Sequence, residues 1–109
     1  MRCRPPLEKH IVANIMRALR ARSGVVVRKR HGTAMGVAGD PDLYGSINGK
    51  HFEIEVKRPD GPSRLTILQT QRLLEWKMAG ALGGVARSVE EALQILGLSA
   101  AAAEKGVRL

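Results

Sequence analysis

Two acidic residues flank a short turn signal in the middle of the chain. The dipeptide Asn48-Gly49 suits a two-residue type I′ turn, and segments that alternate apolar and polar residues lie on both sides of it. A hairpin with this turn places Asp42 opposite Glu55. Facing residues of an antiparallel pair have Cβ atoms about 5 Å apart, where like charges destabilise the sheet. A divalent cation would compensate for this, because Mg²⁺ takes carboxylate oxygens as ligands.

Lys57 follows Glu55 by two residues and therefore points to the same side of the predicted strand. Its ammonium group would hold a water molecule or offset charge that develops on a phosphate. The alternative is an exposed polar face, on which Glu53, Glu55 and Lys57 are in water while the intervening apolar residues face the core. Glu53, which faces Tyr44 in the same register, indicates that not every acid here needs a role.

Glu8 is an acid among the apolar residues of a predicted helix. At 100° per residue the apolar residues of this helix gather on one arc, and Glu8 falls near the centre of that arc. A buried unpaired carboxylate is expensive, so Glu8 is expected to have a partner or a metal-linked task. The alternative is an acid in the first turn that favours the helix dipole and reaches solvent. The opposite side of the helix is basic and carries Lys9, Arg17 and Arg20.

Gln69 repeats this pattern in a second predicted helix, where it shares a side with Leu73 and Trp76. A polar amide among apolar neighbours is expected to have a hydrogen-bond partner. Either the amide orients Lys57 or a water molecule, or it makes a structural hydrogen bond to the backbone.

The elements that must position these residues follow from hydrophobic patterning, capping and turn signals. Pro5 and Pro6 precede the first helix, and Ser88 with Glu91 forms a capping box for the last. Helices are predicted over 7–22, 65–79 and 88–96, and strands over 25–30, 42–47, 50–57 and 83–87. This order of helix, three strands, helix, strand and helix predicts an α/β fold with a mixed sheet flanked by helices.

The length and composition bound the class of protein. A chain of 109 residues suits one domain over 1–109, with a flexible tail over 98–109. The net charge of +8 and the pI of about 10.6 favour a polyanionic partner, and nucleic acid is the leading candidate. With three aromatic residues in the chain, the composition argues against a single-strand binder that relies on base stacking.

Cysteine content and hydropathy indicate a soluble protein of a reducing compartment. The lone Cys3 excludes an internal disulfide, and the three histidines show no zinc-ligand spacing with it. No apolar run is long enough to span a membrane, and 1–6 lacks the apolar stretch of a signal peptide. We therefore expect a cytoplasmic protein with no membrane association and no small-molecule cofactor.

The two hairpin segments carry a recognisable motif. The segment 39–43 reads GDPDL and 55–57 reads EVK, which matches the G-x-P-D…E-x-K signature of the PD-(D/E)XK nuclease superfamily. More narrowly, the chain resembles the VRR-NUC family, the virus-type replication-repair nucleases, as a stand-alone domain of the kind found in phages. The resemblance extends from Glu8 through the hairpin to Gln69 and the turn at 79–81. It implies a restriction-endonuclease-like core with the order αβββαβ.

The resemblance implies metal-assisted hydrolysis of phosphodiester bonds. Asp42, Glu55 and the backbone carbonyl of Val56 would bind Mg²⁺ or Mn²⁺. Glu8 would either polarise water or join a second metal site.

The remaining implied roles belong to Lys57 and Gln69. Lys57 would position the attacking water and offset charge on the scissile phosphate, while Gln69 would steady the nucleophile or the lysine. The basic residues expected to contact DNA are Lys9, Arg17, Arg20, Arg28, Lys29, Arg30 and Arg58.

Two other functions compete with this interpretation. A non-catalytic DNA-binding module would use the basic cluster 28–30 and the basic helix face, but its aligned acids would repel DNA without a metal. A phosphate-binding loop over 45–50 is one residue short, and His51 replaces the required Ser or Thr.

The substrate follows from size and from the resemblance. A chain this small has little surface with which to read base sequence, so cutting directed by DNA structure is expected. The family contains enzymes that act on branched DNA, and a homodimer would place two sites on two strands of a four-way junction.

Overall fold

The computed structural model describes residues 7–31, 36–60 and 64–98. Its elements are α1 (Glu8–Arg20), β1 (Val25–Lys29), β2 (Leu43–Ile47), β3 (Lys50–Val56), α2 (Ile67–Met78), β4 (Leu82–Ala86) and α3 (Val89–Ile95). The predicted order of helices and strands is confirmed, and no predicted end differs from the observed one by more than two residues. Pro5, Pro6, Cys3 and the tail beyond Leu98 lie outside the described residues. No helix among the described ranges is long and apolar enough to cross a membrane.

The four strands form one mixed sheet in the order β1-β2-β3-β4. The first two pairs are antiparallel, and β4 lies parallel to β3 because the chain crosses over through α2. In the hairpin of β2 and β3, Leu43 pairs with Ile54 and Ile47 with Lys50. Asn48 and Gly49 both have positive φ angles, of 49° and 87°, as a type I′ turn requires. The predicted turn and register are therefore confirmed.

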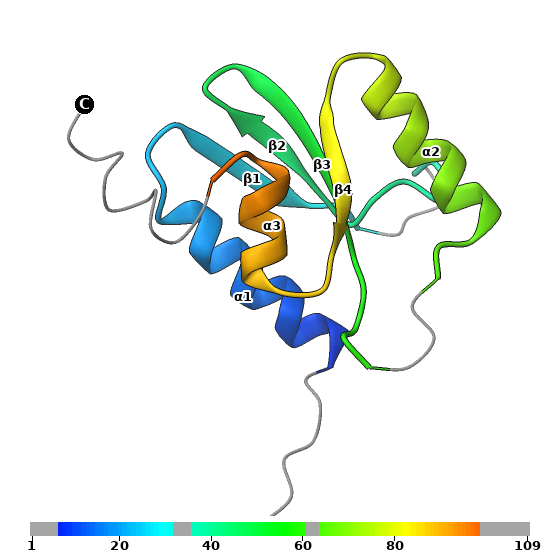
Figure 1. Ribbon diagram of the computed structural model, residues 1–109, viewed down its shortest axis with the longest axis horizontal. Coiled ribbons are helices and arrows are strands. Elements are labelled where there is room, and N and C mark those ends of the chain that lie inside the picture. Colours follow the sequence, from blue (N-terminus) through cyan, green and yellow to red (C-terminus); the bar gives the residue numbers. More distant parts are fainter. Residues whose placement is uncertain (1–6, 32–35, 61–63, 99–109) are drawn as a thin grey trace, which may run out of the picture.

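Neighbouring glycines of β4 show that helices cover both faces of the sheet. A Cβ atom on Gly83 would meet side chains of α2, whereas a Cβ atom on Gly84 would meet Ile95 of α3. Successive residues of a strand point to opposite faces, so α2 and α3 lie on opposite sides. In Figure 1, α1 and α3 lie side by side, and α2 stands apart beyond β4.

The main core lies between the sheet and the pair α1 and α3. It is mainly aliphatic, as the composition predicts, with Phe52 as its one buried aromatic side chain in the described chain. Its central buried side chains come from four elements and are Ile15, Leu19, Val27, Leu43, Phe52, Ile54 and Val56. Burying these side chains contributes roughly 1.5–3 kcal/mol each, which makes this layer the main stabilising one.

The other face of β3 is also covered, which the sequence left open. Glu53 is fully buried and Glu55 is 3% exposed. The exposed polar face considered for these acids is therefore wrong, because α2 packs over β3 and β4 on that side.

The capping of α3 departs from prediction by one residue. Ser88 Oγ accepts a hydrogen bond from the backbone N–H of Glu91, as expected of an N-cap. The carboxylate of Glu91, however, accepts from the backbone N–H of Arg87 rather than from that of Ser88. Both groups still satisfy free backbone donors at the start of the helix.

Candidate active site

Three acids from three elements converge at one end of the sheet. Glu8 is the first residue of α1, Asp42 precedes β2, and Glu55 lies near the end of β3. One carboxylate oxygen from each lies within 4.8 Å of the other two. The carboxylate of Asp42 is held in place by the backbone N–H of Val56, which donates to its Oδ2 at 2.8 Å. The three oxygens are a donor set that fits a hard divalent cation.

Glu8 reaches this cluster for a reason other than the predicted one. The helical wheel placed it at the centre of a buried face, yet its side chain is exposed. Within 7–31, 36–60 and 64–98, no segment buries the first turn of α1, and the neighbouring Leu7 is also 47% exposed. Glu8 is thus a first-turn acid, as the alternative held, whose carboxylate lies beside those of Asp42 and Glu55.

The electrostatics of Glu55 also favour a cation. Burial, followed by repulsion from and hydrogen bonding with Asp42, raises the pKa of Glu55 to about 8, although the ammonium of Lys57 opposes the shift. Glu55 therefore holds a proton at neutral pH when no metal cation is bound. A bound cation would take the place of this proton, since ligating carboxylates must be ionised.

Lys57 and Gln69 complete the cluster beside Glu55. The Lys57 ammonium nitrogen lies 3.6 Å from Oε2 of Glu55 and donates to Oε1 of Gln69 at 3.1 Å. The amide nitrogen of Gln69 donates to the same Glu55 oxygen at 3.3 Å. Gln69 also closes a capping box at the start of α2, where its Oε1 accepts from the backbone N–H of Thr66. Both alternatives for Gln69 therefore hold, and α2 begins at Ile67 because Thr66 caps it.

The catalytic and metal-binding roles of these residues stay predictions, as does that of the Val56 carbonyl. The geometry nonetheless assigns each side chain a feasible task. The acids provide oxygen ligands, and Lys57 provides a positively charged ammonium group, which a hydrogen bond to Gln69 holds in position.

Six of the seven predicted DNA-contacting residues are exposed. They are Lys9, Arg17, Arg20, Arg28, Lys29 and Arg58. Arg58 is paired with Asp60 at 2.9 Å. Arg30 differs, because its guanidinium turns inward and donates to Glu53 and to the carbonyl of Pro41. Its charge is thus already compensated.

A second polar network was missed at the sequence level. Fully buried Glu53 accepts two hydrogen bonds from Arg30, at 2.7 and 3.2 Å, and its Oε2 lies 2.6 Å from Nε2 of His51. The His51 ring lies 4.9 Å from that of Trp76, whose indole N–H donates to Asp40. The available signal was alternation, which puts Glu53 and His51 on the same side of β3 as Glu55.

Known proteins resemble this chain in structure. No family model and no curated protein matches the sequence. A solved structure named "VRR_NUC domain protein" aligns with a TM-score of 0.68 at 21% identity, covering 87% of this chain and 88% of the other. A second, named "VRR_NUC domain", aligns with a TM-score of 0.66 at 23% identity, covering 83% and 94%. The chain therefore has the fold of the VRR_NUC domain, as its motifs predicted.

Proposed function

We propose that this protein is a metal-dependent nuclease that hydrolyses phosphodiester bonds in DNA. The observation that carries the proposal is the convergence of Glu8, Asp42 and Glu55 within 4.8 Å, next to the ammonium of Lys57. The fold shared with VRR_NUC domains and the net charge of +8 support it.

Asp42 and Glu55, with Glu8, would hold Mg²⁺ or Mn²⁺. When bound, the ion supplies Lewis acidity and neutralises charge on the phosphate. The protein prepares this site by fixing the Asp42 carboxylate on the N–H of Val56 and by withdrawing Glu55 from water. Ligands that are held in place before binding lose little freedom when the ion enters.

Lys57 stabilises the negative charge that develops on the phosphate and orients the attacking water. Its ammonium is a donor of three hydrogen bonds, of which Gln69 accepts one and Glu55 lies within ion-pair distance. The remaining donor directions are available to the substrate. Gln69 is a positioning residue, because it contacts Lys57 and Glu55 and is itself anchored by the cap at Thr66.

A purely DNA-binding module explains the acids less well. Two carboxylates opposite each other and a third nearby repel phosphate in the absence of a cation. Glu55 is also buried at a cost in stability, as the direction of its pKa shift shows. Such a cost is expected where function requires it.

The test is cleavage of linear, flapped, splayed and four-way DNA in Mg²⁺ or Mn²⁺, with EDTA as the control for metal dependence. Asp42→Asn and Glu55→Gln are each expected to abolish cutting, and Lys57→Ala is expected to slow it about 100-fold. Asp60→Asn is the matched control, since Asp60 is an exposed acid outside the cluster. Cutting that survives all three substitutions would show that the site is wrong. DNA binding with no cutting by the wild type would favour the module.

We further propose that branched DNA is the preferred substrate and that the protein acts as a homodimer. An exposed apolar stripe on α2 supports the proposal that two copies of the chain associate. Its residues Ile67, Leu74 and Met78 are 81%, 52% and 80% exposed. Residues seven and eleven positions apart lie on one side of a helix. In an antiparallel pair of α2 helices, Ile67 of each copy would pack on Met78 of the other, as two-fold symmetry requires.

Light scattering at assay concentration tests the dimer. We expect a dimer for the wild type and a monomer for Met78→Lys, while Lys77→Glu, beside the stripe, keeps the dimer. A monomeric wild type that cuts linear duplex and four-way DNA equally well would refute both parts of this proposal.

A further inference from the structure

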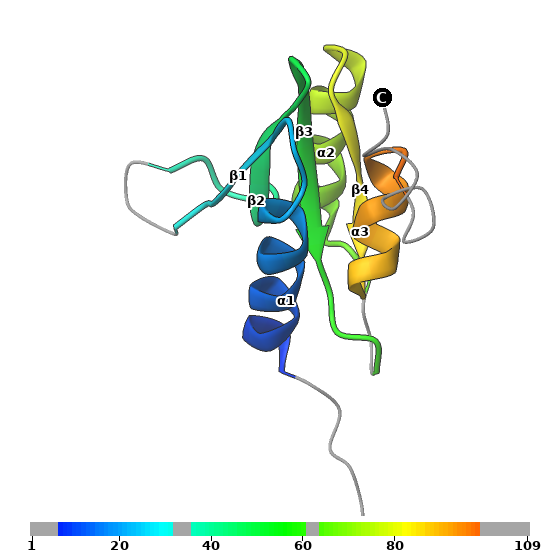
Figure 2. The same ribbon diagram turned by 90° about the vertical axis from the view of Figure 1, so that its left-hand side faces the viewer.

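Part of the sheet surface beside α2 is not covered by a helix. On this side α2 packs over β3 and β4. Among the residues that the structure describes, no helix packs as extensively on the same side of β1 and β2, although the Arg30 guanidinium lies over Tyr44. The segment 36–42 lies against α2, where Arg72 donates to the carbonyl of Ala38 and Trp76 donates to Asp40. In Figure 2, β1 and β2 lie beyond β3 on the side away from β4. We call this surface the open face, and its side chains are Val26, Arg28, Tyr44, Ser46 and His51, with Trp76 at its border. Val26 is 52% exposed and Arg28 is exposed as well.

Aromatic rings gather on the open face. The chain has three aromatic residues, of which Phe52 is in the core while Tyr44 and Trp76 are half-buried here. The His51 ring lies against that of Trp76 with centroids 4.9 Å apart, and its side chain is 40% exposed. The Arg30 guanidinium lies 4.5 Å from the Tyr44 ring and 5.9 Å from the Trp76 ring.

Buried polar contacts hold these rings in place. Glu53 has no exposed surface and binds both Arg30 and His51, while Asp40 accepts from the Trp76 indole N–H at 3.2 Å. A buried ion pair contributes little stability compared with apolar side chains of the same volume. It does fix the orientation of the groups it joins, and rings fixed in advance lose little entropy when a ligand stacks on them.

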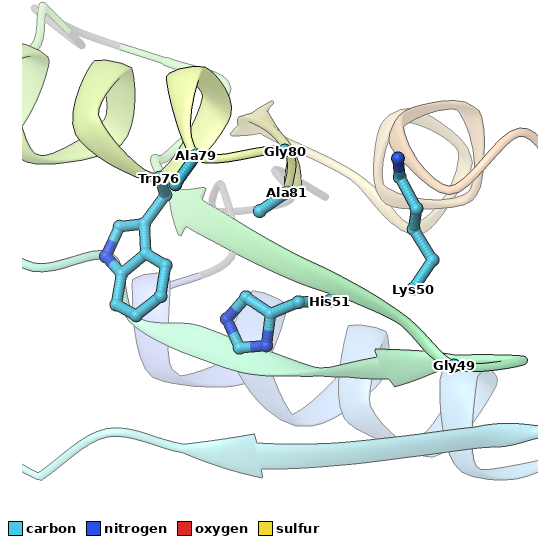
Figure 3. A pocket seen from close by; sticks show the side chains of 7 residues that line it. All are labelled: Gly49, Lys50, His51, Trp76, Ala79, Gly80 and Ala81. Atoms are coloured by element: carbon cyan, nitrogen blue, oxygen red, sulfur yellow. The ribbon is translucent and has the colours of Figure 1, made fainter.

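A pocket of about 290 Å³ opens beside Trp76 and His51. Figure 3 shows the two rings next to each other, the turn Ala79–Ala81 beside them, and the Lys50 side chain directed away. The volume is just below the roughly 300 Å³ at which pockets for small molecules begin. A single flat ring system matches this size better than a larger ligand does.

The open face and the proposed active site lie on the same side of β3, on either side of Glu53, which is buried beneath Arg30 and α2. His51 precedes Glu55 by four residues on the same side of the strand, a separation of about 13 Å at roughly 3.3 Å per residue. Stacked nucleotides rise about 3.4 Å each along one strand. A strand whose phosphate lies at the acids and which passes outside Arg30 therefore needs at least about four nucleotides to reach His51. Arg28 provides exposed positive charge next to this path.

We propose that the open face binds an unpaired stretch of the DNA strand to be cut, with a base stacked on the Trp76 and His51 rings. Bases in a duplex are stacked on each other and cannot stack on a protein ring, whereas unpaired bases can. The inference rests on the proposed nuclease function and specifies its substrate class: DNA with a single-stranded stretch next to the cleavage position.

The test uses the full chain in EDTA, so that DNA binding is measured without cutting. Trp76 is the sole tryptophan, and its fluorescence therefore reports directly on the open face. We expect a twelve-nucleotide oligo-dT to quench Trp76 fluorescence in a saturable way and to bind more tightly than a twelve-base-pair duplex. Unchanged fluorescence on binding, or equal affinity for duplex, would overturn the proposal.

Substitutions separate stacking from charge. His51→Gln removes the ring but retains an amide donor for Glu53, and we expect it to weaken oligo-dT binding about tenfold while duplex binding stays nearly constant. Arg28→Gln is the matched control, because it removes charge from the same face and weakens both ligands alike. Equal weakening of both ligands by His51→Gln would overturn the proposal. Trp76→Phe keeps an aromatic ring but lacks the fluorescent tryptophan, so its binding is measured with labelled oligo-dT. We expect it to retain most of the affinity for oligo-dT. Thermal melts verify that each variant is folded.

The outcome is independent of the nuclease test. If the wild type cuts no DNA but still prefers oligo-dT to duplex, the proposed active site is refuted and the inference about the open face is retained. Cutting without oligo-dT preference would support the nuclease and overturn this inference.

Discussion

Replacing Glu55 by Gln is expected to make the metal-free protein more stable, although it removes a central residue of the proposed active site. Burial and the nearby Asp42 raise the pKa of Glu55 to about 8. The folded chain therefore binds this proton more tightly than the unfolded chain, whose Glu has a pKa of about 4.5. The wild type is fully stabilised below pH 4.5 and loses stability as the pH rises towards 8. Gln has nearly the same shape and does not ionise, so this loss disappears.

The magnitude follows from the two pKa values. Each pH unit corresponds to about 1.4 kcal/mol. Because the unfolded chain releases this proton at a lower pH than the folded chain does, the stability is lower than below pH 4.5 by about 3 kcal/mol at pH 7 and by about 5 kcal/mol at pH 9. Glu55→Gln also loses the pairing with Lys57, worth up to about 1 kcal/mol. The net gain at pH 9 is about 4 kcal/mol, which raises Tm by more than about 10 °C in a domain of this size.

The assay is thermal unfolding in EDTA at pH 5, 7 and 9, repeated with excess Mg²⁺. The difference in Tm between Glu55→Gln and the wild type is expected to grow with pH, and Mg²⁺ is expected to stabilise the wild type but not Glu55→Gln. Glu75→Gln is the matched control, because the Glu75 side chain is 65% exposed. Parallel Tm curves for Glu55→Gln and wild type across this pH range would refute the reasoning.

Three further outcomes follow from other parts of the structure. Lys57→Ala lowers kcat for DNA cleavage about 100-fold with affinity retained, because its charge acts mainly in the transition state; an equal loss of affinity would contradict this role. Arg17→Gln with Arg20→Gln lowers the slope of log affinity against log salt by about 2, measured by anisotropy; an unchanged slope would show that DNA does not contact α1. Gly45→Ala destabilises the fold by about 3 kcal/mol or more in urea unfolding, because the added Cβ meets the backbone carbonyl of Val26; wild-type stability would show that the strands can separate there.

Matched controls accompany these measurements. Lys77→Ala removes an exposed lysine away from the acids and leaves kcat unchanged. Lys77→Gln with Arg64→Gln removes two exposed charges from α2 and its approach, which tests whether the salt slope depends on position. Gly49→Ala adds a Cβ where no atom lies within 4 Å, so its cost reflects only the positive φ angle of 87°.

The sequence by itself determined the local geometry of the hairpin. A two-residue turn requires positive φ at both central positions, and the dipeptide Asn48-Gly49 tolerates it at low cost. Once the turn is known, the period of two along each strand sets which residues face each other. Asp42 therefore lies opposite Glu55, and Lys57 on the same side, before any tertiary contact is considered.

The helix positions were only partly determined in this way. Periodicity correctly placed Ile15 and Leu19 in the core, but it also placed Glu8 on the buried face, whereas Glu8 is exposed in the structure. A helical wheel gives only the angular position of a residue around the helix axis. Exposure at the end of a helix also depends on whether the sheet or another helix extends far enough to cover it. The convergence of Glu8 with the hairpin acids is likewise a matter of how α1 lies against the sheet.

Only the tertiary structure decided which polar residues of β3 are buried and which aromatic rings lie partly at the surface. Glu53 alternates with core residues just as an exposed residue would, and its burial arises because α2 and the segment around Asp40 pack over it. The three aromatics suggested little base stacking, yet folding brings Tyr44 and Trp76 from different elements to one surface. Turn chemistry acts within a few residues, whereas burial and convergence depend on contacts between segments far apart in the chain.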